Sequence, residues 1–447
     1  MSTTLVSNTE FKGDVARLPS LSAPMPKSAL TYADFINGIY IDRIGGVINR
    51  SDNINNRVNL FRGSHANYIA DNGTLAEALN SVNVIDRHPH SLKKLGLRVE
   101  GEVTNYAASP IDFTATAWAK TGVSVTAGEN YWHTLTENNA TSQHGIRDTT
   151  TQFVTTTANV ISVYVKAGTA SRVQLAANGG GTEAYANFDL ANGAVLLLGT
   201  GLTTALIEPG YNGSWRCSLV LTNPAAATAD IRISFISGDK DAMSPSFAGS
   251  GRTLQIAIAQ VERSVIAPTS PITFSTRSLD ISTLLPDIPE TSQKNFALFI
   301  SGIMPASPRG DDGGNNIVTL YNDTKKEFIS IGQGSRRGSY PYAPLATHNI
   351  GGSFAAVPFT GRGYQSYRQF AVLVSVSGST VKIICNNGGV QTLLTNATNG
   401  FERVLLGRGL NASLGTTGCW SAFISKIALF DTALSDDEMF DQFAALS

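Results

Sequence analysis

Tyr131, Trp132 and His133 form the cluster in this sequence best suited to binding a sugar. A saccharide ring is held by an exposed aromatic face that stacks on its apolar side, with polar groups beside it. Successive side chains of a strand point to opposite faces, so the two adjacent aromatic residues cannot both point into one core. The cluster therefore predicts a carbohydrate-binding surface.

A second candidate surface lies in a loop-rich stretch near residues 332–363. Surfaces rich in tyrosine and arginine are typical of protein interfaces and of glycan sites. The stretch therefore predicts either a subunit contact or a glycan contact, and the residues do not separate the two. It is formed by Tyr340, Tyr342, Tyr364 and Tyr367, with Arg336, Arg337, Arg362 and Arg368 beside them.

The sequence supports a metal site less well than it supports a glycan-binding surface. Asp311 and Asp312, with the nearby Asn315 and Asn316, could offer oxygen ligands to calcium, although a solvated polar turn is the favoured interpretation. His88-Pro89-His90 lacks nearby acidic or cysteine partners, so we do not interpret it as a metal site. We expect no cofactor.

The sequence carries no catalytic signature. It has no G-x-S-x-G elbow, no H-E-x-x-H zinc motif, no phosphate-binding loop and no dinucleotide fingerprint. Paired carboxylates for glycoside hydrolysis need only be about 5–10 Å apart in space, so a sequence does not reveal them. We therefore expect a protein that is not an enzyme, with a glycan depolymerase or esterase as the rival interpretation.

Charge and cysteine content narrow the classes of partner. The 447 residues carry 33 Lys and Arg against 34 Asp and Glu, so no net field attracts nucleic acid. No apolar run approaches the roughly 20 residues of a membrane helix, so no membrane insertion is expected. Three cysteines, Cys217, Cys385 and Cys419, are too few for a disulfide framework, which favours buried thiols over a Cys385–Cys419 pair.

Short apolar runs with period-two alternation dominate the chain, which predicts an all-β protein of two β-sandwich (jelly-roll) domains in series. Ile231–Phe235 is one such run. A short C-terminal helix is expected after the capping-box sequence Ser435–Glu438, with Met439, Phe440, Phe443 and Ala444 on one face. The expected divisions are an extended arm (1–29), a small β-rich connecting segment (30–96), a first sandwich (97–274), a proline-containing linker (275–289) and a second sandwich (290–447).

Ordered motifs across residues 32–280 resemble a module of bacteriophage tail-fibre and head-fibre proteins. The motifs are Tyr32–Gly38, Arg62–Gly73, Leu95–Tyr106, Ala117–Gly122, Ser162–Gly168, Gly213–Arg216 and Ala259–Glu262 followed by Thr269-Ser270 and Thr276-Arg277. The resemblance implies a sandwich similar to carbohydrate-binding modules, with Trp118 and Trp215 in its core. Val84-Ile85-Asp86 and Pro271-Ile272-Thr273 depart from the family pattern, in connecting segments.

The segment Ile424–Glu438 resembles the last strand and short helix of concanavalin A-like and laminin G-like sandwiches. Together the two resemblances imply a structural virion protein, assembled in the cytoplasm of a bacterial host, that contacts host-surface polysaccharide. The arm is expected to bind other virion proteins, because its few apolar residues are insufficient for independent folding. A homo-oligomer, most plausibly a trimer, follows from the family and from particle symmetry. A purely structural protein without a ligand is the third interpretation.

Overall fold

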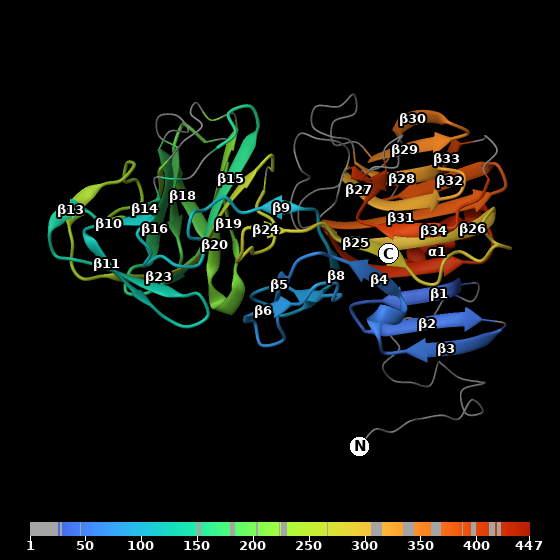
Figure 1. Cartoon of the computed structure of the whole chain (residues 1–447), viewed down its shortest axis with the longest axis horizontal. Coiled ribbons are helices and arrows are strands. Elements are labelled where there is room, and N and C mark those ends of the chain that lie inside the picture. Colours follow the sequence, from blue (N-terminus) through green and yellow to red (C-terminus); the bar gives the residue numbers. More distant parts are fainter. Residues whose placement is uncertain are drawn as a thin grey trace, which may run out of the picture.

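The computed structural model describes residues 26, 29–44, 46–148, 150, 153–178, 184–202, 204–222, 224, 230–265, 267–304, 315–333, 344–358, 368–386, 388–394, 399–410, 416–417 and 422–447. The chain forms two β-sandwich lobes that lie side by side (Figure 1). All strand pairs within the described residues are antiparallel, which confirms the predicted fold class.

The first sandwich consists of two six-stranded sheets. One has the order β10 (Trp118–Thr121), β14 (Gly145–Asp148), β21 (Asp230–Phe235), β16 (Arg172–Asn178), β17 (Tyr185–Asp189) and β18 (Ala194–Leu198). The other has the order β11 (Val123–Ala127), β12 (His133–Glu137), β23 (Thr253–Arg263), β15 (Ala158–Ala167), β20 (Trp215–Thr222) and β19 (Thr204–Pro209). A small ladder joins β13 (Thr141–Gln143) to β22 (Ser246–Ala248), and a 3-10 turn, η3 (Tyr211–Gly213), precedes β20.

Alternating side chains build the core of this sandwich. In β21, Ile231, Ile233 and Phe235 are buried against the opposite sheet, whereas Arg232 lies on the outer face. The period of two therefore places apolar residues inside and polar residues outside, as the sequence predicts. Trp118 is completely buried here and donates from Nε1 to the carbonyl of Ser109 at 3.0 Å, which confirms its expected core position.

The second sandwich has one large sheet of ten strands and one of seven. The large sheet has the order β3 (Val47–Ser51), β2 (Ile39–Ile44), β1 (Ala29–Asp34), β37 (Ala422–Phe430), β26 (Asn295–Met304), β31 (Arg368–Ser377), β32 (Thr380–Cys385) and β33 (Gln391–Leu394), and β8 (Lys94–Val99) joins β37 to β7 (Ile85–Arg87). The smaller sheet has the order β30 (Ser353–Pro358), β29 (Pro344–Ile350), β28 (Glu327–Gln333), β27 (Asn315–Asn322), β34 (Arg403–Leu406), β25 (Ile281–Leu284) and β4 (Val58–Phe61).

A 3-10 turn and three two-stranded ladders lie outside these large sheets. They are η2 (Ile54–Asn56), the hairpin of β5 (Ala66–Ile69) with β6 (Leu75–Ala78), the ladder of β9 (Val103–Thr104) with β24 (Thr276–Arg277), and the ladder of β35 (Gly409–Leu410) with β36 (Thr416–Thr417).

The strand pairing corrects the division expected for residues 30–96 and 275–289. Strand β1 lies between β2 and β37, and β8 pairs with β37, so the N-terminal strands belong to the large sheet of the second sandwich. Strand β25, inside the expected linker, pairs with both β4 and β34. Figure 1 shows the N-terminal strands, in blue, beside the C-terminal strands, in red. The sequence did not predict this pairing, because alternation identifies a strand but carries no information on a partner hundreds of residues away.

The expected long loop at 332–363 contains regular structure. Strands β29 and β30 form a hairpin whose turn is Gly351-Gly352, and both glycines have positive φ. Glycine reaches these dihedral angles without steric cost, which explains why a glycine-rich stretch closes a tight hairpin.

The C-terminal helix α1 (Asp436–Leu446) begins as predicted. Ser435 Oγ accepts from the amide of Glu438, and the Glu438 side chain accepts from the amide of Ser435. The face that packs on the sheet differs from the expected one, because Met439, Phe443 and Leu446 are buried, whereas Phe440 and Ala444 are exposed. Leu446 lies one turn beyond Phe443, so the buried face runs along Met439, Phe443 and Leu446 and leaves Phe440 and Ala444 beside it.

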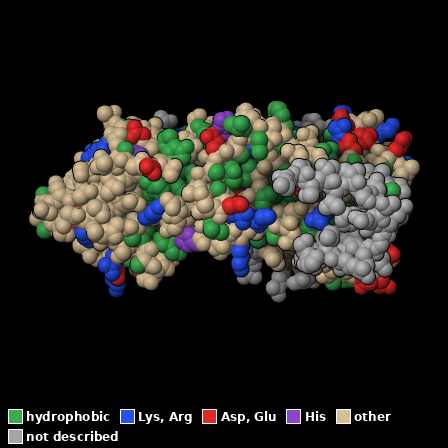
Figure 2. Space-filling model, turned by 90° about the horizontal axis from the view of Figure 1, so that it is seen from below, with side chains coloured by type: hydrophobic (Ala, Val, Ile, Leu, Met, Phe, Trp, Pro, Cys, Tyr) green, Lys and Arg blue, Asp and Glu red, His purple; other side chains and the backbone are tan. Residues whose placement is uncertain are grey.

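Cys217 has a buried thiol in the core of the first sandwich, as predicted, and burial raises its pKa. Cys385 is buried in the second core, whereas Cys419 lies outside the described residues. None of the helices in the described residues is long and apolar enough to cross a membrane. Figure 2 shows charged side chains of both signs scattered over one face of the molecule, in keeping with the balanced composition.

The N-terminal segment covers the outer face of the first sandwich as well as contributing to the second. Ile69, Leu75 and Leu92 pack with Trp132, Tyr164, Tyr211, Ala257 and Ile258, which lie on or beside the β12–β23–β15 sheet. His90 adds a hydrogen-bonding contact of 2.6 Å between its Nε2 and the carbonyl oxygen of Ser214. One stretch of chain therefore joins the two lobes.

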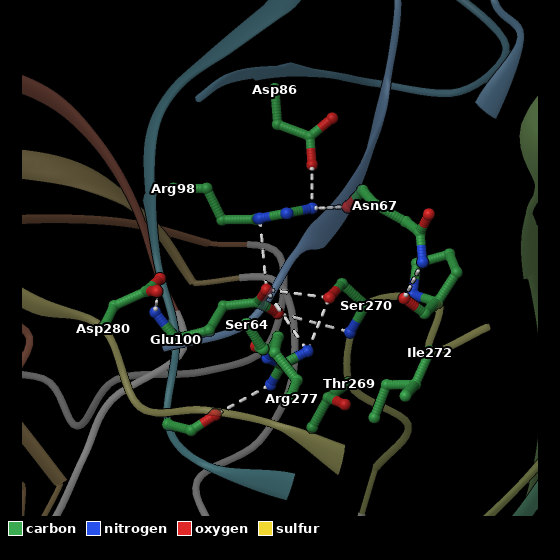
Figure 3. Close-up of polar contacts among 12 residues, drawn as sticks. Ser64, Asn67, Asp86, Arg98, Glu100, Thr269, Ser270, Ile272, Arg277 and Asp280 are labelled. Carbon is green, nitrogen blue, oxygen red and sulfur yellow. Dashed lines mark hydrogen bonds and ion pairs between the residues drawn. The ribbon is translucent and has the colours of Figure 1, made fainter. Parts of the chain in front are cut away.

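Six buried charged side chains lie where the lobes meet. Figure 3 labels Asp86, Arg98, Glu100, Arg277 and Asp280 among them. Each exposes 5% or less of its surface, and their charges cancel. They are Arg62, Arg98, Arg277, Asp86, Glu100 and Asp280, which we call the junction network.

Glu100 is the centre of this network. Its Oε2 lies 3.1 Å from Arg98 Nε and 3.3 Å from Arg277 Nη1, and it accepts from Ser270 Oγ at 2.7 Å. Arg98 also contacts Asp86 at 2.9 Å, and Asp280 accepts from the amide of Glu100 at 2.9 Å. Burial alone would raise the pKa of Glu100, but the attraction of Arg277 and Arg98 outweighs it and holds this pKa below its ordinary value.

The network connects with the first sandwich through residues 269–272. Thr269 Oγ1 donates to Glu262 at 2.6 Å, and the amide of Ile272 donates to Gln260 Oε1 at 2.9 Å. Glu262 and Gln260 lie on β23, whereas Arg98 lies on β8 of the second sandwich. Buried ions and hydrogen bonds therefore fix how the two lobes are connected.

We predict that the first sandwich folds alone and the second does not. A fragment of residues 103–265 retains both sheets, whereas 290–447 lacks β1, β4, β8 and β25, which complete its two sheets. Thermal unfolding followed by circular dichroism should show a cooperative transition for 103–265 and none for 290–447. Co-expression of residues 26–102 with 281–447 should restore a soluble second sandwich. A cooperative transition for 290–447 alone would contradict the prediction.

We also predict that Glu100→Gln destabilises the protein by about 3–5 kcal/mol, because removing one member of a buried ion pair leaves its partners uncompensated. Urea denaturation measures this change. The matched control is Asp323→Asn in the exposed pair with Lys326, which should leave stability unchanged.

The cost of Glu100→Gln should depend on pH. The pKa of Glu100 is lowered in the folded state, so its contribution is complete above the ordinary glutamate pKa of about 4.3 and is lost as pH falls through the lower folded-state value. The difference between wild type and variant should therefore shrink under acid conditions. A difference that stays constant between pH 7 and pH 3 would show that the carboxylate charge is not what stabilises the junction.

Candidate functional site

A polar pocket lies on the outer face of the β10–β14–β21 sheet in the first sandwich. Its volume is about 290 Å³, and residues of four strands and one loop line it. Hydroxyl and amide groups come from Thr121, Gln143, Ser234 and Ser244, and charged groups come from Arg147 and Arg232.

Strand register brings these residues together. Gly145 lies opposite Ser234, and Arg147 lies opposite Arg232, across the β14–β21 ladder. A Cβ atom on Gly145 would lie 2.7 Å from Ser234 Oγ, so glycine allows the two strands their close approach at the floor of the pocket.

The two arginines form a cross-strand pair of like charge, which is unfavourable in an antiparallel sheet. Asp230 offsets part of the repulsion, because one of its carboxylate oxygens lies 3.0 Å from Arg232 Nη2 and 3.5 Å from Arg147 Nη1. One carboxylate for two guanidinium groups leaves the pocket with a net positive charge.

Arg232 is held in place by a further contact. Its Nη1 donates to Ser244 Oγ at 3.1 Å, and its side chain is 17% exposed. The Nε atom is buried and has no hydrogen-bond partner in the part of the chain that the structure describes. A buried donor without a partner costs free energy.

The wall at Ser244 is fixed by buried amides. Gln174 Oε1 accepts from the amide of Ser244 at 2.6 Å, and Gln174 Nε2 donates to Asn187 Oδ1 at 2.8 Å. Asn187 in turn donates to the carbonyl of Asp241 at 2.9 Å. Ser244 itself has φ +53°, a left-handed conformation uncommon for serine, which these contacts hold in place.

The predicted aromatic cluster does not form an exposed stacking surface. Trp132 is buried with Tyr211 and Ile69, with Lys166 Nζ 4.1 Å from its ring centre. His133 is buried on the opposite side against Phe113, at 5.4 Å between ring centres. The adjacent aromatic residues Tyr131 and Trp132 pack in the same apolar cluster beneath the N-terminal segment, so the argument that they could not share one core was wrong. His133 packs on the other side, against the core of the sandwich. Tyr131, with φ +68°, is partly buried.

Trp215 packs against the core of the first sandwich and donates from Nε1 to the carbonyl of Leu190 at 2.8 Å. It is partly buried, with its ring 4.8 Å from that of His90. The position expected for Trp215 is therefore reached, at the boundary of the core.

The other candidates lie outside the described residues or give no cluster. Tyr340, Tyr342, Tyr364 and Tyr367 lie outside, as do Asp311 and Asp312. His88 accepts from the amide of Ser91 and His90 contacts Ser214. Among the described residues, no group of three or more His, Cys, Asp and Glu side chains is placed to hold a metal.

Sequence reasoning missed Arg147, Arg232 and Asp230. A partial signal exists, since Ile231 and Ile233 alternate with Arg232 and Ser234 and thereby assign the latter two to an outer face. The register of β14 against β21 is what places Arg147 beside them, and neither strand's own sequence specifies it.

No protein-family model matches the sequence, and no curated protein matches it significantly. The chain is distantly similar to solved structures of a carbohydrate-binding module and of laminin G-like domains. The CBM40 module of a Ruminococcus gnavus sialidase is 12% identical, with 34% of this chain and 84% of that chain covered and a TM-score of 0.25. Domains LG4-5 of the mouse laminin alpha1 chain are 9% identical, with 71% and 94% covered and a TM-score of 0.22.

A sialidase of Trypanosoma rangeli is 10% identical, with 73% of this chain and 63% of that chain covered and a TM-score of 0.26. None of these three is a bacteriophage protein, so the resemblance to fibre proteins stays a prediction from sequence motifs.

Proposed function

We propose that this chain is a structural component of a bacteriophage particle, not an enzyme, that contacts host-surface glycans through the pocket of its first sandwich. The observation that carries the glycan part is the pocket itself. It offers hydroxyl, amide and guanidinium groups in a cavity of about 290 Å³, a composition suited to the hydroxyl groups of a sugar.

The rigidity of the pocket supports a binding role. Two of its walls are paired strands, and its third is a loop held by Gln174 and Asn187, both completely buried. A site built on regular elements loses little conformational freedom when it binds, so weak polar contacts add up to useful affinity. Repeated copies in an oligomer, most plausibly a trimer, would strengthen weak single-site binding further.

The virion role rests on the ordered sequence motifs between residues 32 and 280. Residues 1–29 are proposed to bind other virion proteins, since this proline-containing segment has too few large apolar residues to fold alone but offers apolar anchors at Leu5, Phe11, Val15, Leu18 and Leu21. Strand β1 of the second sandwich begins at Ala29, the last residue of the expected arm, so a deletion that spares this strand ends at residue 28.

We predict that immobilised host capsule or lipopolysaccharide retains the full-length protein, and that the protein does not shorten the polysaccharide. Thr121→Trp should abolish retention, because the indole occupies the rim of the pocket. Thr126→Trp, at an exposed position on an edge strand of the opposite sheet, is the matched control and should bind as the wild type does. Shortening of the polysaccharide by the wild-type protein would identify a depolymerase instead, and neither retention nor shortening would leave a purely structural protein.

We further predict that deletion of residues 1–28 leaves two folded sandwiches that no longer join the particle. The described strands begin at Ala29, so the deletion removes no strand. Circular dichroism should match that of the full chain, and complementation of a phage lacking the gene, followed by immunoblotting of purified particles, reports incorporation. Normal incorporation of the truncated chain would rule out the arm as the attachment segment.

A further inference from the structure

The pocket on the β14–β21 ladder lacks the feature that neutral sugars use most. Its lining within the described residues contains no aromatic ring. Binding of a neutral sugar in water draws much of its free energy from an aromatic face against the apolar side of the ring. A ligand of this pocket must therefore obtain its affinity from charge and from hydrogen bonds.

The charges that face the pocket leave an excess of positive charge. Arg147 and Arg232 share the single carboxylate of Asp230. On the neighbouring strand, Arg172 is paired with Asp239. Lys120 on β10 directs its ammonium group elsewhere, donating to the carbonyls of Thr114 at 2.9 Å and Ala115 at 2.7 Å. The uncompensated charge therefore resides on the two arginines.

The donors of these arginines suit a carboxylate. Arg232 donates from Nη1 to Ser244 and from Nη2 to Asp230, and each of these nitrogens carries a second N–H group that can donate to a ligand. Arg147 has a half-exposed side chain, and its contact with Asp230 is long at 3.5 Å. Guanidinium groups bind carboxylates through charge-assisted hydrogen bonds that are about twice as strong as neutral ones.

The size of the pocket limits the ligand to a small unit. A volume of about 290 Å³ lies at the small end of the roughly 300–1,000 Å³ that ligand pockets usually have, so the pocket suits one sugar unit of a longer chain. The hydroxyl groups of Ser234 and Thr121 and the amide of Gln143 remain for the ring hydroxyls.

We propose that this pocket recognises an acidic sugar residue of a glycan, with Arg147 and Arg232 binding its carboxylate. The inference rests on the proposed glycan-binding function and specifies its ligand class. It also accounts for the like-charged pair across the β14–β21 ladder. The two guanidinium groups repel each other in the free protein, and a bound carboxylate would attract both and offset that repulsion.

The test uses the full chain and oligosaccharides that carry galacturonate, glucuronate or sialate, each beside its own carboxyl-reduced form. Isothermal titration calorimetry should show that at least one acidic oligosaccharide binds about tenfold or more tightly than its reduced form. Arg147→Gln and Arg232→Gln should each remove this preference. Arg172→Gln, which changes a similarly exposed arginine on the same sheet outside the pocket, is the matched control and should retain it.

Two further readouts locate the contact. The NMR signal of the Arg232 Nε–H group should shift when the acidic oligosaccharide is added, and affinity should fall as salt is raised, because exposed charges are screened. Unchanged melting temperatures would show that the variants fold, and Arg147→Gln, at an exposed position, provides the test if Arg232→Gln does not.

The outcomes separate this inference from the function on which it rests. Equal binding of acidic and reduced forms, or binding that survives both substitutions, would overturn the acidic-sugar assignment and leave glycan binding standing. Failure to bind any oligosaccharide, while host polysaccharide is retained in a Thr121→Trp-sensitive manner, would also overturn the assignment alone. Failure to bind any oligosaccharide or host polysaccharide would overturn both.

Discussion

The ion pairs centred on Glu100 are the constraint on which the arrangement of the two lobes depends. Glu100 follows β8, which belongs to the second sandwich. Its carboxylate contacts Arg277 on β24, a short strand that follows the last strand of the first sandwich in the chain. Charges buried to this extent are costly unless they are paired, so the segments that carry them must come together for any of them to be buried.

This constraint explains why the N-terminal segment contacts both lobes. Residues 66–92 place an apolar surface on the first sandwich, while β1, β4 and β8 complete the sheets of the second. The chain therefore enters the second sandwich, forms the whole of the first as an insertion between β8 and β25, and returns to finish the second. An insertion held at its base by paired charges presents its far side to the surroundings in a defined orientation.

The pocket illustrates how a fold creates a site without a sequence motif. Arg147 and Arg232 are 85 positions apart and become neighbours because β14 pairs with β21 in one register. The like charges that result are unfavourable in the free protein, and Asp230 reduces that cost without removing it. An unfavourable pair of like charges that the fold retains is the kind of feature that points to a functional site.

The sequence by itself determined the elements. Alternation identified strands, and the Ser435–Glu438 pattern identified the start of the helix. The motifs shared with fibre proteins implied a core position for Trp118, and the small number of cysteines favoured a buried Cys217. These are local properties, fixed by backbone sterics and by side chains a few positions apart. Only the tertiary structure decided that β1 pairs with β37, that Trp132 is covered by Ile69, and that Arg147 meets Arg232. Strand pairing and burial depend on contacts between distant segments, and a period-two pattern is equally satisfied by many partners.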